Sequence, residues 1–190
     1  MAEGNNFFEK DYMLKLIQLF LPALVFSSFS CKDSVLNTGS QSLGKIVFES
    51  EYVNKAWGFF YRGSYWGEDG KIYTYDLAKA NIQWKENHDG FYTEEELISK
   101  YHHFDALRSS IPKDTIQWGY TLALLVNPKM ISDTAGMGAD MGITTRSIYL
   151  YRSDERKYQK IVLSQEGDWQ WYNTSPSTTE LLQWFKRSQN

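Results

Sequence analysis

The residues from Tyr101 to Asp105 place two adjacent histidines beside a carboxylate. Imidazole and carboxylate side chains can bind a metal ion or transfer protons. Adjacent residues of a helix point in directions about 100° apart, so His102 and His103 cannot hold one ion together. A zinc pair on a helix uses positions i and i+4, a spacing that this stretch lacks. We therefore expect surface histidines here and no metal site.

A glycine-rich stretch from Ile131 to Ile143 carries two further acidic residues, Asp133 and Asp140. Glycine-rich loops can surround a phosphate or a cation. The spacing, however, matches neither the P-loop, nor the dinucleotide fingerprint, nor the calcium loop. A connecting loop is the favoured interpretation. Because loops on a rigid scaffold often carry function, Asp133 and Asp140 are retained as candidate ligand-binding residues.

Groups for covalent catalysis are scarce. The sequence has no Gly-x-Ser-x-Gly motif, and its single cysteine is Cys31. A pair of carboxylates for glycoside hydrolysis could be drawn from four acidic residues: Asp69, Asp76, Asp89 and Asp168. The sequence gives no distances between these residues. It therefore favours a binding protein over an enzyme, with no cofactor, and leaves the catalytic residues unknown.

Aromatic residues make up 16% of the chain, including seven Trp and thirteen Tyr. Packing in a core is the favoured interpretation, because rings contribute the largest buried surfaces. The alternative is a binding surface for a glycan or a protein, with Trp57, Tyr65 and Trp66 as candidate residues. The net charge of −3 and the absence of a Lys/Arg run argue against nucleic acid as a partner.

Two hairpins are predicted to position these residues. The first spans Ala56–Leu77 around an Asp-Gly turn at 67–70, and rings on both of its faces indicate a central position in a sheet. The second pairs Arg146–Arg152 with Tyr158–Leu163. A short strand over Lys45–Ser50 is expected to precede both hairpins.

Three helices are expected to cover the sheet. Thr93 and Glu96 form a capping box for a helix that runs to about Phe104. Asp114 precedes a segment to Val126 that fits a helix, although its alternating apolar residues also fit a buried strand. Ser177 is predicted to cap a C-terminal helix. The predicted fold is α+β, with an antiparallel sheet built from two hairpins and covered by two or three helices.

The N-terminal stretch Met13–Cys31 has the order of a bacterial export signal. Lys15 precedes an apolar run, Leu16–Phe26, which is too short for a spanning helix and has the length of a signal-peptide core. The acidic residues before Met13 suggest that translation starts at Met13. A buried N-terminal helix of a cytosolic protein is the alternative.

The last four residues of this stretch, Ser28-Phe29-Ser30-Cys31, resemble the lipobox of bacterial lipoproteins. The resemblance implies that Cys31 carries a lipid and that the preceding peptide is removed. Lys32-Asp33-Ser34 resembles a signal for transfer to the cell surface. Palmitate on Cys31 would then anchor the protein in the outer membrane, where it would be periplasmic or surface-exposed.

The expected organisation is a signal peptide over 1–30, a flexible tether over 31–44 and a single domain over 45–190. The expected function is binding of a protein or a glycan by a domain of the cell envelope. Two alternatives remain open at this stage, namely a small envelope hydrolase and a lipoprotein immunity factor against a toxin.

Overall fold

The computed structural model describes residues 43–102, 104–136, 138 and 140–189. These residues belong to one compact unit, Gln41–Asn190. The predicted signal peptide, Cys31, most of the predicted tether and His103 lie outside the described residues. Leu43 is described, and its buried side chain packs in the core, so the folded part includes at least the end of the segment assigned to the tether. No helix within the described ranges has the length and apolar character needed to cross a bilayer.

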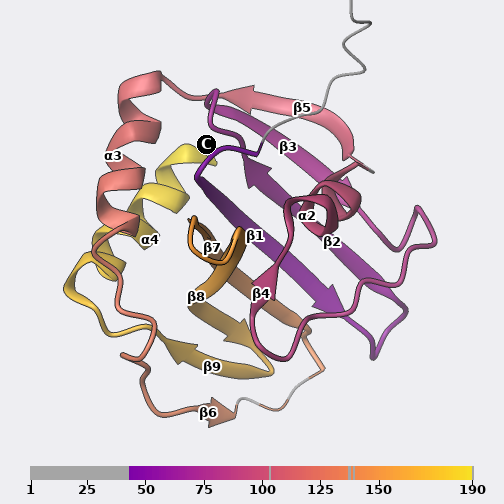
Figure 1. Cartoon of the computed structure of the whole chain (residues 1–190). Helices are drawn as coiled ribbons and strands as arrows, with labels where there is room; N and C mark the ends of the chain where they lie inside the picture. Colours follow the sequence, from indigo (N-terminus) through magenta and orange to yellow (C-terminus); the bar gives the residue numbers. More distant parts are fainter. Residues whose placement is uncertain (1–42, 103, 137, 139, 190) are drawn as a thin grey trace, which may run out of the picture. The chain divides into compact units, whose positions relative to one another are not determined.

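The described strands form a nine-stranded antiparallel sheet (Figure 1). Its order is β5-β3-β2-β1-β7-β8-β9-β6, and β4 pairs with β8 beside this path. The strands are β1 (Ile46–Asn54), β2 (Phe60–Trp66), β3 (Lys71–Asp76), β4 (Phe91–Tyr92), β5 (Phe104–Ser110), β6 (Ala135–Gly136), β7 (Ile143–Arg152), β8 (Lys157–Gly167) and β9 (Trp169–Tyr172).

Both predicted hairpins are present as antiparallel pairs, β2 with β3 and β7 with β8. At the first turn, Gly70 adopts a φ of 78°, a conformation that glycine takes without steric cost. The prediction of an α+β fold with an antiparallel sheet is confirmed, but a sheet built from two hairpins is too simple. Strand β1 is longer than expected and lies between the hairpins, where it pairs with both β2 and β7.

Helix α2 (Glu94–Tyr101) begins with the predicted capping box, because Thr93 Oγ1 accepts from the Glu96 N–H and Glu96 accepts from the Thr93 N–H. The helix ends before Phe104, which instead begins β5. That strand pairs with β3, a contact between segments distant in sequence that the local pattern does not reveal.

The segment after Asp114, for which helix and strand were both considered, forms helix α3 (Lys113–Ala123). Its N-cap residue is Pro112 and not Asp114. Helix α4 (Pro176–Ser188) begins earlier than expected, and Ser175 is its N-cap residue. The predicted cap at Ser177 is therefore wrong, since that residue lies within the first turn.

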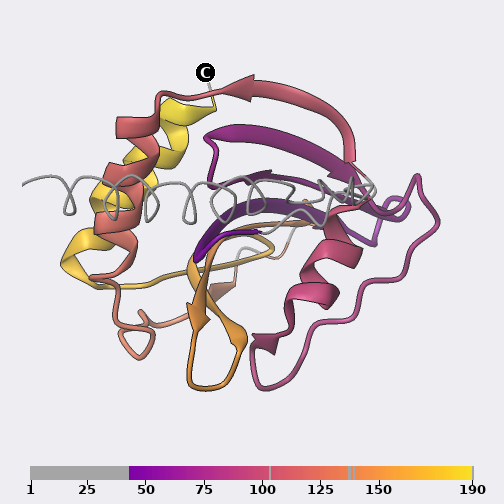
Figure 2. The same cartoon turned by 45° about the horizontal axis from the view of Figure 1, so that its top comes forward.

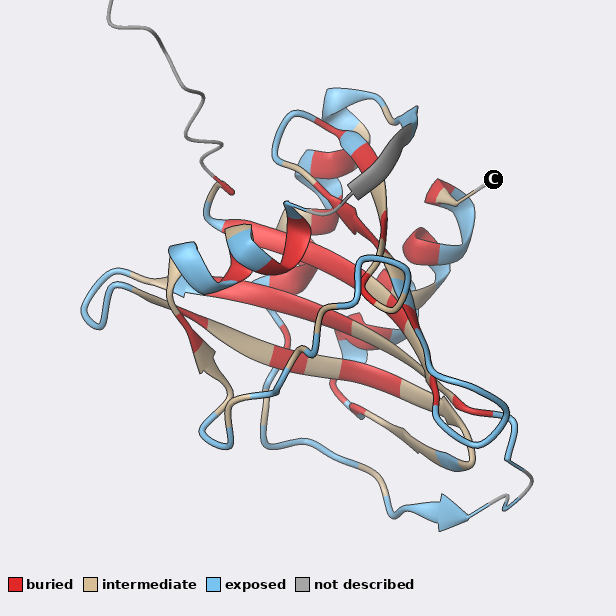
Figure 3. Ribbon diagram, turned by 90° about the vertical axis from the view of Figure 1, so that its right-hand side faces the viewer, coloured by how far each residue is buried: buried red, intermediate tan, exposed pale blue. Residues whose placement is uncertain are grey.

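Two apolar clusters lie on opposite faces of the sheet. Side chains of α3 and α4 pack on one face around Phe48 and Trp66, and the two helices run next to each other (Figure 2). Helix α2 covers part of the other face, around Val47 and Tyr149. Figure 3 shows the buried positions along the central strands. The three helices found in the described residues leave part of this large sheet uncovered, and the partly open face carries the candidate site.

Candidate ligand-binding cleft

Two carboxylates of β1 point to the α2 side of the sheet. Successive strand residues face opposite sides, so Glu49 and Glu51 share the face of Val47, while Phe48 packs against α3 and α4. Both glutamates are buried, with 0% and 4% of their surface exposed. Buried charges are costly unless they are paired, so the partners of these carboxylates define the site.

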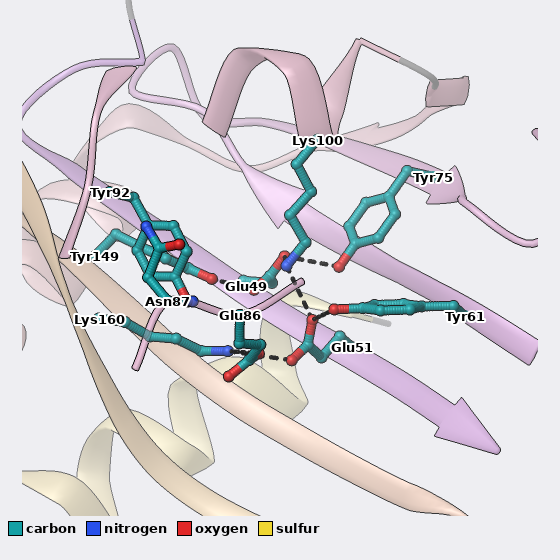
Figure 4. Close-up of polar contacts among 10 residues, drawn as sticks. All are labelled: Glu49, Glu51, Tyr61, Tyr75, Glu86, Asn87, Tyr92, Lys100, Tyr149 and Lys160. Carbon is teal, nitrogen blue, oxygen red and sulfur yellow. Dashed lines mark hydrogen bonds and ion pairs between the residues drawn. The ribbon is translucent and has the colours of Figure 1, made fainter. Parts of the chain in front are cut away.

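Lys100 of α2 is the first partner. Its side chain is fully buried, and Nζ lies 2.7 Å from Glu49 Oε1 and 2.9 Å from Glu51 Oε2 (Figure 4). One ammonium group therefore joins both carboxylates to the helix. Lys100 lies in the last turn of α2, on the buried side of the helix with Leu97 and Tyr101.

Tyrosine hydroxyls supply further donors to both carboxylates. Tyr75 and Tyr149 donate to the two oxygens of Glu49 at 2.6 and 2.8 Å, and Tyr61 donates to Glu51 Oε2 at 3.2 Å. Burial, followed by the negative charge of Glu49, raises the pKa of Tyr75 and of Tyr149 well above its ordinary value. The two hydroxyls therefore stay protonated and act as permanent donors.

Lys160 of β8 holds the second oxygen of Glu51 and reaches the solvent side of the cluster. Its Nζ lies 3.2 Å from Glu51 Oε1 and 2.5 Å from Glu86 Oε1. The Lys160 side chain is only 6% exposed, whereas that of Glu86 is 53% exposed. Solvent exposure within the cluster thus increases from Glu49, which is fully buried, to Glu86, which is about half exposed.

Neighbouring charges keep Glu51 and Lys160 ionised. Burial alone raises the pKa of Glu51, but Lys100 and Lys160 more than offset burial and lower the pKa to about 2. Burial likewise lowers the pKa of Lys160, and the charges of Glu51, Glu49 and Glu86 reverse the effect, so the pKa is raised. At neutral pH the Glu51 carboxyl has no proton to donate.

A cleft of about 620 Å³ opens over the solvent-exposed end of the cluster. Its polar floor is formed by Glu51 and Lys160, and aliphatic groups such as Val162 of β8 continue that floor. Three rings line the cleft, namely those of Phe59, Tyr61 and Trp84. Ligand pockets in proteins have about 300–1,000 Å³, apolar walls and a few fixed polar groups, and the cleft fits this description.

One wall of the cleft is the segment 82–87, which forms neither helix nor strand. The backbone N–H of Ile82 donates to the Leu77 carbonyl, and Asn87 Nδ2 donates to the Phe91 carbonyl at 2.7 Å, so both ends of the segment are fixed. Between them, the Trp84 ring stacks on Tyr92 and its centre lies 5.2 Å from Lys100 Nζ. The Trp84 indole N–H is buried and finds no acceptor among the described residues.

The structure places the three aromatic candidates from the sequence in different surroundings. Trp66 is fully buried against α4, where its indole N–H donates to Ser188 Oγ. Tyr65 is also buried and stacks on Tyr101. Only Trp57 is exposed, at 75%, in the β1–β2 loop that supplies Phe59 to the cleft.

The acidic candidates lie apart from the cleft. Asp133 and Asp140 are exposed, and Asp140 accepts a hydrogen bond from Asn54 through its backbone carbonyl. The described residues contain no group of three or more His, Cys, Asp and Glu that could hold a metal ion.

The four carboxylates considered for hydrolysis lie in or beside different turns, and each accepts a hydrogen bond from a backbone N–H. These residues are Asp69, Asp76, Asp89 and Asp168. Each of the four residues therefore stabilises the local backbone, and they do not come together in the cleft.

Sequence reasoning missed the residues that form the cluster. Glu49 and Glu51 alternate with Phe48 in a strand, a pattern that normally indicates a solvent-exposed face. Lys100 falls on the buried side of α2 together with Leu97 and Tyr101. That helical spacing was the available signal, because a lysine on an apolar face requires a buried anion.

Comparison with known proteins does not assign the chain to a family. No family model matches it, and searches of curated proteins and of solved structures give no significant match either. Functional inference therefore rests on the geometry of the cleft.

Proposed function

We propose that the protein is a binding domain that captures a glycan in the cleft over Glu51 and Lys160. The observation that carries this proposal is the set of three rings, Phe59, Tyr61 and Trp84, beside fixed charged groups in a cleft of about 620 Å³. A sugar ring has apolar C–H faces and a rim of hydroxyl groups. The three rings offer flat apolar surfaces, and charged and amide side chains offer hydrogen bonds.

The polar groups around the rings support the same proposal. Gln83 and Gln165 line the cleft, and an amide side chain both donates and accepts hydrogen bonds, as a sugar hydroxyl does. Glu51 and Lys160 are held in place by the buried cluster, so little ordering is needed when a ligand binds. Such a prearranged floor favours binding of a small polar ligand.

A glycan panel titrated against the full-length protein in detergent tests this proposal, with tryptophan fluorescence and calorimetry as readouts. Phe59 is 47% exposed, so Phe59→Ala removes a cleft ring at small cost to folding. We expect this variant to weaken binding about tenfold. Trp169→Ala is the matched control, because Trp169 is also exposed but lies on β9 outside the cleft lining. Failure of every glycan to bind, or equal losses in both variants, would contradict the proposal.

A small hydrolase is the second candidate, since Glu51 and Glu86 meet at the same Lys160 ammonium in the cleft. Paired carboxylates cleave glycosidic bonds when one of them holds a proton. The lowered pKa of Glu51 excludes it as the acid and leaves that role to Glu86. Release of shorter sugars from a bound oligosaccharide, lost in Glu86→Gln, would favour the hydrolase over the binding domain.

We also propose that this domain is carried on a lipid anchor at Cys31, in the outer membrane of a bacterium. The lipobox-like residues and the use of the only cysteine in the chain at that position support the anchor. Palmitate labelling of the wild type and of Cys31→Ala tests it. Label on the wild type alone is expected, and an unlabelled wild type would contradict the anchor while leaving glycan binding untouched.

A further inference from the structure

The buried part of the cluster is electrically balanced without Glu86. Glu49 and Glu51 supply two negative charges, and Lys100 and Lys160 supply two positive charges. All four side chains are at most 6% exposed. Opposite charges and hydrogen bonds within a buried cluster offset part of the cost of burying its members, whereas a buried charge without a partner is strongly destabilising. Glu86 is therefore a fifth charge that the fold does not need for charge balance.

Glu86 is also the most exposed member of the cluster. Its side chain is 53% exposed, and solvent screens a contact of this kind strongly. The segment that carries Glu86 is fixed by Asn87 on one side, so the carboxylate can leave Lys160 by rotation of its own side chain. Lys160 is then left in the cleft with one donor free and Glu51 as its remaining anionic partner.

The other exposed charges of the cleft are positive. Lys55 and Lys85 both line it, together with Lys160. With the Glu86 carboxylate turned away, three ammonium groups face the cleft against the single carboxylate of Glu51. A cleft with this balance attracts an anion.

We propose that the glycan bound in the cleft is acidic, and that its carboxylate takes the place of the Glu86 carboxylate on Lys160. This inference rests on the proposed function and names the substrate class of the same site. The exchange replaces one carboxylate with another, so Lys160 keeps an anionic partner, and Glu86 moves into solvent. Hydrogen bonds to charged groups are stronger than neutral ones, which gives the carboxylate a preference over a hydroxyl at this position.

The test uses acidic oligosaccharides, each paired with its carboxyl-reduced neutral counterpart. Oligomers of galacturonate, of hyaluronan and of alginate are titrated against the full-length protein in detergent. At least one acidic member is expected to bind about tenfold more tightly than its reduced partner. Lys160 itself is a poor site for substitution, because it also neutralises buried Glu51.

The discriminating variant is Glu86→Gln, which removes the competing carboxylate and keeps the size of the side chain. The acidic oligosaccharide is expected to bind this variant about fivefold more tightly than the wild type, so the ratio of its affinity to that of the neutral counterpart should increase. Glu155→Gln, an exposed change in the β7–β8 turn, is the matched control and should change neither affinity.

Three outcomes are distinct. A preference for the acidic form that increases in Glu86→Gln supports the inference. Binding of neutral glycans without any preference for a carboxylate, or with no gain in Glu86→Gln, overturns it while the proposed function stands. Absence of binding to any glycan in the panel overturns the proposed function, and the inference falls with it.

Discussion

Lys100 Nζ lies 2.7 Å from Glu49 Oε1, and neither side chain has any exposed surface. This contact joins α2 to the central strand β1 beside an apolar cluster rich in tyrosine. Because the same ammonium also binds Glu51, loss of Lys100 would leave Lys160 as the only cation among the described residues that pairs with these two buried carboxylates.

Lys100→Met is therefore expected to lower the free energy of unfolding by about 3–5 kcal/mol, the cost of leaving a buried charge without its partner. Urea denaturation followed by circular dichroism measures this change. Lys129→Met, at an exposed lysine outside the cluster, should change stability by less than about 0.5 kcal/mol. Similar losses in the two variants would show that the Lys100 pair contributes little.

Acid should weaken the fold through Glu51. Its pKa is about 2 in the folded protein and 4.5 in the unfolded chain. The stabilisation is therefore fully present above about pH 4.5 and is lost as the pH falls towards 2. Urea denaturation at several pH values between 6 and 3 measures this dependence. In Glu51→Gln the acid-dependent loss should be smaller than in the wild type, and an unchanged slope would contradict the assignment.

Gly63 leaves the space through which Tyr75 reaches Glu49. A Cβ atom at position 63 would lie 2.5 Å from the Tyr75 hydroxyl oxygen and 2.7 Å from the Ser50 carbonyl oxygen. Gly63→Ala is expected to destabilise the protein by about 1–3 kcal/mol, because the backbone and the tyrosine must shift. Part of this loss should disappear in a Tyr75→Phe background, and a double-mutant cycle measures the coupling. Fully additive losses would place the strain elsewhere.

Substitution of Trp66 tests whether this residue packs in the core or binds the ligand. Trp66→Phe removes the hydrogen bond to Ser188 and part of a fully buried ring, so a loss of about 1–3 kcal/mol in stability is expected. Glycan affinity, measured well below the melting temperature, should stay at the wild-type value. A weaker affinity in the folded variant would return Trp66 to the set of ligand-binding residues.

Local chemistry in the sequence predicts much of this fold. The Asp-Gly turn before Lys71 and the reciprocal bonds of Thr93 and Glu96 each involve residues a few positions apart, and both are found. Strand β5 was missed because its pairing with β3 is not encoded by any turn between them. The N-cap pattern does not always locate the start of a helix, because Ser177 fits the pattern although α4 already begins at Pro176.

The cleft was beyond the reach of sequence patterns for the same reason. Glu51 is separated from Lys100 by 49 positions and from Lys160 by 109 positions. Nothing near Glu51 in the sequence indicates that two lysines so far away neutralise it. Of the residues that line the cleft, Phe59 and Tyr61 were within the predicted aromatic hairpin. Phe59 is exposed, whereas Tyr61, Tyr65 and Trp66 are buried, and the packing of α2 and α4 decides which rings of the hairpin are covered.

The central position of β1 also determines when the sheet can close. One edge of β1 pairs with β2, the next strand in the sequence. The other edge pairs with β7, which begins only at Ile143. Pairing between segments so far apart in the chain slows folding. During synthesis, β1 therefore keeps an unpaired edge until most of the polypeptide has left the ribosome. A polypeptide that crosses a membrane in an extended state would do so before this pairing has completed the sheet.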